Sequence, residues 1–297
     1  MYKKSNYTLL LFALIAFSIY CALSIGEAWD ERYEILRGKT TLEYFFSLGK
    51  INNNILYREY NSTIYYTLLY FFTTIFPNNY QIEVSHLINM SFSIATIFGI
   101  SKVCNELFNK KVGKITFLIL FLYPIFFGHM AFNSKDTIIA FSHVWIVYLL
   151  FRYIKNQEIK EKTNSYILFI AILAATATGI KFVFLGTLIP VLLFFLIDVF
   201  YFKKITSKKF NKVNLLKDII KCFLIFYFLL IIFWIDVYSN IFVLPLEIIQ
   251  KSFSNPNLIG WPYNLMNGNY FTTFENNIPK LYFFIINISF SLLYARI

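Results

Sequence analysis

Long uncharged apolar runs constrain this chain more than any other feature of its sequence. The run from Tyr7 to Ile25 contains 19 residues and no charge, which is long enough to cross about 30 Å of hydrocarbon. Comparable runs predict spans near residues 7–25, 84–104, 113–129, 137–154, 164–180, 182–202, 219–237 and 279–297. The sequence therefore predicts an all-α, polytopic transmembrane helical bundle of about eight spans. We expect residues 1–297 to form a single domain.

The composition agrees with a membrane protein. Apolar residues make up 58% of the chain and charged residues only 14%, which is too few charges to cover a soluble globule. The three cysteines lie in or beside apolar runs, so neither disulfides nor a cysteine metal site are expected. The net charge of +11 does not indicate a nucleic-acid partner, because the basic residues form short clusters between the spans.

The basic clusters predict the orientation of the chain in the membrane. Residues 64–82 are also uncharged, but Pro77 interrupts them, and a crossing there would place the basic connections outside, against the positive-inside rule. We therefore expect 64–76 to be a juxtamembrane helix at the outer interface and the N-terminus to be cytoplasmic. The outer side then carries long loops at 26–83 and 238–278, with two short turns between them near 129–136 and Gly179–Lys181.

Two adjacent carboxylates, Asp30 and Glu31, follow directly on the first span. Carboxylates at the boundary between water and lipid are well placed to remove a proton from a polar acceptor beside a membrane-dissolved partner. The alternative is that they only solvate a loop. Both interpretations stay open on these residues alone.

A second charged turn lies between two predicted spans. Lys135 and Asp136 there either cap a helix at the interface or meet a phosphate and orient an acceptor, a metal or a sugar hydroxyl. Lys181 lies between apolar runs with no acid nearby in sequence, so it either extends to the interface or is neutralised by something anionic. His86 and His143 lie inside apolar spans and are interpreted as core histidines.

Several segments in order along the chain resemble those of a known family. They are Asp30–Tyr33 with the following helix-like stretch, the 64–76 segment, His129–Asp136, Gly179–Lys181 and Trp261–Pro279. This order resembles the GT-C type of integral-membrane glycosyltransferase. The resemblance is to family 39 in particular, the relatives of protein O-mannosyltransferases and aminoarabinose transferases.

The resemblance implies an enzyme of protein glycosylation or a related pathway, a hexosyl- or pentosyltransferase. It would take a sugar from a polyprenyl-phosphate donor and transfer it to a hydroxyl or amine of a protein, lipid or glycan. Transfer would occur on the outer face, by direct inverting displacement. The implied catalytic residues are Asp30 as the base, Glu31 and Asp136, and the implied donor-phosphate ligands are Lys135, His129 and Lys181.

The resemblance also bears on cofactor, surroundings and partners. No cofactor is required, and a divalent metal, Mg²⁺ or Mn²⁺, held by Asp30 and Asp136 is left open. A multi-pass position in a bacterial inner membrane is expected, with membrane lipid around the chain. The main alternative from another class is a transporter or flippase of lipid-linked sugars, and a third is a non-catalytic structural subunit.

The chain departs from the family pattern in several places. Ser134 stands where a bacterial subgroup has proline, and Thr137-Ile138 stands where it has Ile-Pro. The usual threonine before Lys181 is missing, and residues 60–63 lack the usual proline. The sequence also stops at Ile297 within an apolar run, which suggests a chain shortened at its C-terminus.

Overall fold

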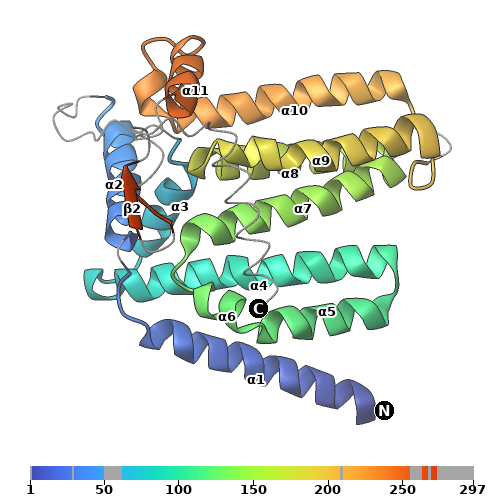
Figure 1. The fold of residues 1–297 in the computed structure, drawn as a ribbon, viewed down its shortest axis with the longest axis horizontal. Helices are drawn as coiled ribbons and strands as arrows, with labels where there is room; N and C mark the ends of the chain where they lie inside the picture. The colour runs from blue at the N-terminus through green and yellow to red at the C-terminus, as the bar shows by residue number, and fades with distance from the viewer. Residues whose placement is uncertain are drawn as a thin grey trace. The chain divides into compact units, whose positions relative to one another are not determined.

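The chain folds into helices that divide into two compact units. The computed structural model describes residues 2–28, 30–49, 62–207, 210–254, 263–266 and 269–272, and Figure 1 shows its ribbon. The two units are Met1–Ser239 and Asn240–Ile297. The expectation of a single domain stays a prediction.

The first unit is built from helices. Its α-helices are α1 (Tyr2–Ser24), α2 (Glu31–Phe46), α3 (Ile64–Thr73), α4 (Gln81–Leu107), α5 (Lys110–Leu122), α6 (Pro124–His129), α7 (Ser134–Asn156), α8 (Lys160–Ile180), α9 (Val183–Ile197) and α10 (Lys212–Ile232). The shorter turns are η1 (Asn78–Tyr80), the π-helical η2 (Asp198–Phe202) and η3 (Ile235–Val237). Helix α4 packs against α1, α5 and α7, and α8 packs against α7, α9 and α10 (Figure 1).

The second unit contains one helix and one hairpin among its described residues. Helix α11 spans Leu244–Ser254, and β1 (Tyr263–Met266) pairs antiparallel with β2 (Asn269–Thr272). The prediction of an all-helical bundle is confirmed for the first unit, and the hairpin is the part that departs from it. Its sequence explains it, because aromatic residues favour strands and the intervening pair Asn267-Gly268 favours a two-residue turn.

Four helices of the described residues are long and apolar enough to cross a membrane. They are Asn78–Leu107, Ser134–Asn156, Lys160–Ile180 and Val183–Phe202. The predicted count of about eight spans is therefore not shown. The predicted spans 7–25 and 219–237 are largely helical, as α1 and α10, and the predicted span 279–297 lies outside the described residues.

The prediction of one continuous span over 113–129 is wrong. Helix α5 ends at Leu122 and α6 begins at Pro124. Tyr123 between them is extended, with ψ 114°, as the residue before a proline prefers. Proline also has no N–H to continue the helix, so it begins α6 at the position where that donor is not needed.

Many large apolar side chains of the first unit face outward. Phe12 on α1 is 71% exposed, Phe194 on α9 is 57% exposed and Phe223 on α10 is 59% exposed. In water such surfaces would associate. Their exposure is that expected of helices whose outer surface contacts lipid tails.

An apolar cluster lies beneath α2 and joins it to the bundle. Its buried members come from α2, α3, α7 and α8: Ile35, Tyr65, Tyr66, Leu69, Ile138 and Ile180. Helix α2 approaches α3 closely at Gly38, where a Cβ atom would lie 1.9 Å from the Tyr66 carbonyl oxygen. Any larger residue at position 38 would push the two helices apart.

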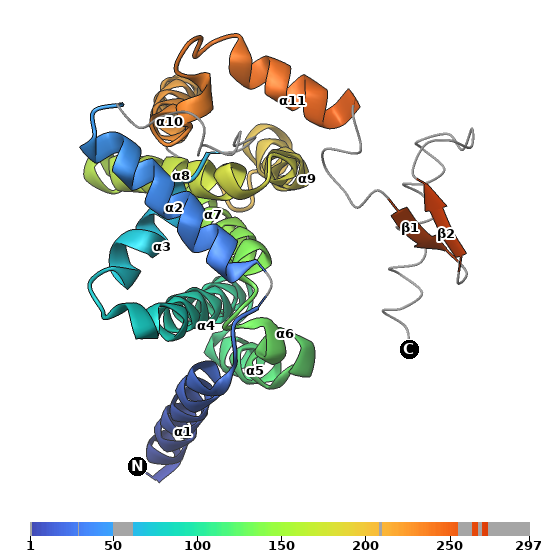
Figure 2. The same ribbon diagram turned by 90° about the vertical axis from the view of Figure 1, so that its left-hand side faces the viewer.

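The segments predicted as short turns, 129–136 and Gly179–Lys181, lie at the same end of the first unit. Helix α1 ends there, α2 crosses it, α7 begins there and α8 ends there (Figure 1), and Figure 2 faces this end. We call it the α2 end. The connections from α4 to α5, from α7 to α8 and from α9 to α10 lie at the opposite end.

Candidate active site

Three carboxylates gather at the first turn of α2. Asp30 is its N-cap residue, and Glu31 and Glu34 lie in the first turn. Negative charge is favourable there because the N–H groups of the first turn point toward it. The helical period places Asp30 and Glu34, four residues apart, on one face of α2.

Glu31 is buried and holds the connection between α1 and α2. Its side chain is 2% exposed, and its Oε1 lies 2.7 Å from Nε2 of His86, which is fully buried. Its Oε2 accepts the backbone N–H of Ala28 at 2.7 Å, and His86 Nδ1 lies 3.0 Å from the Ala22 carbonyl oxygen. The interpretation of His86 as a core histidine is confirmed. This placement favours a positioning role for Glu31 over proton transfer.

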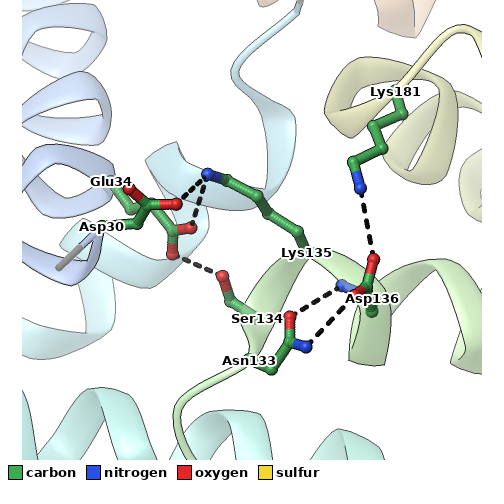
Figure 3. A network of polar contacts seen from close by, with 7 residues as sticks. All are labelled: Asp30, Glu34, Asn133, Ser134, Lys135, Asp136 and Lys181. Atoms are coloured by element: carbon green, nitrogen blue, oxygen red, sulfur yellow. Dashed lines mark hydrogen bonds and ion pairs between the residues drawn. The ribbon is translucent and has the colours of Figure 1, made fainter. Parts of the chain in front are cut away.

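The start of α7 is fixed by Asn133. Its Oδ1 accepts the backbone N–H of Asp136 at 3.3 Å, and its Nδ2 donates to Asp136 Oδ2 at 3.1 Å. The side chains of Ser134, Lys135 and Asp136 then point to different partners, which are Glu34, Asp30 and Lys181 (Figure 3). Asn133 thus forms the helix cap, and Asp136 lies in the first turn.

Lys135 joins α7 to the acidic turn of α2. Its Nζ lies 2.5 Å from Asp30 Oδ2 and 3.9 Å from Glu34 Oε1. The neighbouring hydroxyl of Ser134 donates to Glu34 Oε2. Asp30 and Lys135, two of the predicted site residues, are therefore in direct contact although they lie 105 positions apart in sequence.

Lys181 finds its anion within the protein. It follows α8 in extended conformation, with φ −147°, and its Nζ donates to Asp136 Oδ1 at 3.2 Å (Figure 3). The alternating row Asp30, Lys135, Asp136, Lys181 therefore runs from the start of α2 over the start of α7 to the end of α8.

His129 lies at the edge of this row. It is the last residue of α6 and is exposed. Its Nδ1 lies 3.5 Å from Asn133 Nδ2, and its ring lies beside Phe132 with the ring centres 5.2 Å apart. The structure connects it to the row through Asn133.

Burial divides the carboxylates of this site into two kinds. The side chains of Asp30 and Asp136 are 66% and 67% exposed, whereas that of Glu34 is 4% exposed. Burial raises the pKa of Glu34 to about 7, and the charges of Asp30 and Glu31 act in the same direction. The Ser134 hydrogen bond and the Lys135 charge oppose that rise in the pKa of Glu34 without cancelling it.

The exposed ion pairs can exchange partners with a ligand. An ion pair between exposed side chains contributes only about 0–1 kcal/mol, so a phosphate could replace Asp30 on Lys135 or Asp136 on Lys181. Replacement would leave Asp30 without its ammonium and able to accept a proton. The row thus combines two cations, Lys135 and Lys181, with two exposed carboxylates, Asp30 and Asp136.

The carboxylates present do not fit a metal site. Asp30 and Asp136 are each paired with a lysine. Among the residues that the structure describes, no group of three or more His, Cys, Asp or Glu side chains is arranged to hold a metal ion.

Sequence reasoning missed two members of this site. Glu34 is not among the predicted residues, although its spacing of four residues from Asp30 on a helix is a usable signal. Ser134 enters the prediction only as a departure from the family pattern. No local signal pointed to His86 as the partner of Glu31, because the two lie on different helices.

The comparisons with known proteins identify the family. Residues 63–234 match the family described as dolichyl-phosphate-mannose-protein mannosyltransferase. No curated protein matches the chain, and no solved structure does. The match covers more than half of the chain and includes Lys135, Asp136 and Lys181, while Asp30 precedes it.

Family membership decides between the classes that the sequence left open. The family transfers a sugar from a dolichyl- or polyprenyl-phosphate donor, which makes the chain an enzyme rather than a transporter or a structural subunit. The chain belongs to the dolichyl-phosphate-mannose-protein mannosyltransferase family and is a multi-pass membrane glycosyltransferase.

Proposed function

We propose that this protein transfers a sugar from a polyprenyl-phosphate donor to a hydroxyl or amine acceptor at the outer face of the membrane, by direct inverting displacement. The contact between Asp30 and Lys135 carries the proposal. A carboxylate that can accept a proton, beside a cation that can bind the donor phosphate, supports this reaction at the α2 end.

In the proposed step Asp30 accepts the proton of the acceptor, and the polyprenyl phosphate leaves. The acceptor oxygen or nitrogen attacks the anomeric carbon of the sugar while its proton passes to Asp30. The bond between the anomeric carbon and the phosphate oxygen breaks, and its electron pair leaves with the polyprenyl phosphate. One displacement without an enzyme nucleophile inverts the anomeric centre.

Lys135 and Lys181 stabilise the departing phosphate. Charge grows on that phosphate as the bond breaks, and a fixed ammonium group stabilises it more in the transition state than in the ground state. Asp136 holds Lys181 at 3.2 Å and orients it until the donor binds. His129 is a further donor at the edge of the site.

The outer-face location rests on the distribution of charge along the first unit. The connections from α4 to α5, from α7 to α8 and from α9 to α10 lie opposite the α2 end, and the basic clusters lie in these connections or on the helix ends beside them. The positive-inside rule then places the α2 end outside. With an impermeant thiol reagent on intact cells, cysteines at positions 47 and 254 should be labelled and one at position 207 should not. Labelling at position 207 alone would reverse the topology.

Asp30→Asn tests the base. The amide keeps the shape of the side chain but cannot take the proton, so transfer should fall roughly 10²-fold or more while donor binding changes little. Glu27→Gln is the matched control, because Glu27 is a nearby carboxylate that pairs with Arg32 at 2.7 Å and should be dispensable. Transfer by Asp30→Asn at the wild-type rate would remove Asp30 as the base.

A further inference from the structure

Glu34 is a buried acid that contacts Lys135, and the proposed transfer does not use it. It lies on α2 behind the ion pair, with its side chain only 4% exposed. One carboxylate oxygen accepts the Ser134 hydroxyl, and the other lies 3.9 Å from Lys135 Nζ. It is therefore a second counter-ion of the cation to which we assign the donor phosphate.

The charges around Lys135 do not balance when Glu34 is ionised. Asp30 and Glu34 then supply two negative charges against one ammonium. An arriving phosphodiester adds another negative charge within a few ångströms, where repulsion in a partly buried site is strong. With Glu34 protonated, Asp30 and Lys135 cancel and the added anion meets no excess of negative charge.

We propose that Glu34 is a positioning residue that takes up a proton when the donor phosphate binds, so that Lys135 is released from its carboxylates to the phosphate. This inference rests on the proposed function, because it assigns the donor phosphate to Lys135. It makes donor binding depend on pH through a residue that does not touch the sugar.

The groups that face Glu34 are consistent with a titration near neutral pH. Asp30 and Glu31 approach it from the start of α2 and Tyr65 from α3, while Lys135 and Ser134 approach it from α7. Burial and the two acids raise its pKa to about 7. Small changes in local charge near that value convert a large fraction of Glu34 from one form to the other.

The test measures proton uptake on binding of a simple phosphodiester. The probe is an isoprenyl methyl phosphate, which has no sugar and carries one charge throughout the range used. Calorimetric titrations of the full chain in detergent at pH 7, in buffers of different ionisation enthalpy, give the number of protons taken up. We expect uptake for the wild type and affinity that falls up to roughly tenfold between pH 6 and pH 8.

Two variants separate the charge of Glu34 from its hydrogen bond. Glu34→Gln should bind the probe without that uptake and with little dependence on pH. Ser134→Ala removes the hydroxyl but leaves the carboxylate, so the uptake should persist, with its midpoint at higher pH. Uptake by His86 or His129, which lie near the site, would remain in Glu34→Gln and is thereby distinguished.

The results distinguish this inference from the proposed function. Binding without proton uptake in the wild type, undiminished uptake in Glu34→Gln, or no binding of the probe would each overturn the inference. The proposed function fails separately, if no sugar is transferred from a polyprenyl-phosphate donor or if Asp30→Asn is as active as the wild type. If binding of the probe takes up a proton but the protein transfers no sugar, the inference about Glu34 stands and the proposed reaction is wrong.

Discussion

Two ion-pair clusters join helices at opposite ends of the first unit, and their compositions are inverted. At the α2 end one base, Lys135, contacts two acids, Asp30 and Glu34. At the other end one acid, Glu106, contacts two bases, Arg152 and Lys155, each at 3.0 Å. The first cluster has one more carboxylate than its cation can neutralise, and that carboxylate is buried. The second cluster has one more base than its carboxylate can neutralise. If the two ends face opposite sides of the membrane as we propose, the excess of base lies on the side that the positive-inside rule predicts.

Truncating the shared lysine should have the largest effect. Lys135→Ala removes the cation nearest to Asp30, so transfer should fall roughly 10²-fold and donor affinity should weaken as well. Lys155→Ala is the control from the other cluster, because Glu106 keeps Arg152 at 3.0 Å. Transfer rates and donor binding measured side by side check both. Equal losses in the two variants would show that the inverted composition has no functional meaning.

Replacing Glu34 should have the next largest effect, which falls on the stability of the fold rather than on the rate of transfer. The pKa of Glu34, about 7 in the folded protein, lies above its ordinary value of 4.5. Its ionisation therefore destabilises the fold, and this loss of stability grows as pH rises from 4.5 through 7. Glu34→Gln should raise the free energy of unfolding by about 3 kcal/mol at pH 8, and the gain should shrink toward pH 4.5.

Glu106→Gln should act in the opposite direction. It leaves Arg152 and Lys155 without their carboxylate, so it should lower stability by about 1 kcal/mol at neutral pH. Thermal unfolding in detergent between pH 5 and pH 8 compares the two variants. If both variants shift the unfolding midpoint in the same direction, ionised Glu34 does not destabilise the fold.

The second lysine should have the smallest effect on the reaction. Lys181 is 51% exposed and contacts the outer edge of the row through Asp136, so Lys181→Ala should weaken donor affinity roughly tenfold and slow transfer by a similar factor. Lys221→Ala is its control, since Lys221 on α10 donates to Asn164 at 2.7 Å and has no part in the site. If Lys181→Ala changes neither donor affinity nor the rate of transfer, Lys135 alone remains as the proposed ligand of the donor phosphate.

The sequence predicts the local features of this site better than its contacts. Apolar runs predict most of the helices, and the order of short motifs predicts the family. Pro124 and Asn267-Gly268 carried visible signals for the break after α5 and for the hairpin. Burial of Glu34 had no such signal, because it depends on the packing of α2 against α7, which only the folded chain defines.

The start of α7 has a consequence for how this sequence can change over time. Ser134, Lys135 and Asp136 are consecutive, and they contact Glu34, Asp30 and Lys181 in turn. Each residue of an α-helix turns the next by about 100°, so one residue inserted after Ser134 would rotate Lys135 and Asp136 away from their partners. Substitutions there change one contact, but a change of length exchanges several at once. We expect related sequences to keep the length of this segment fixed.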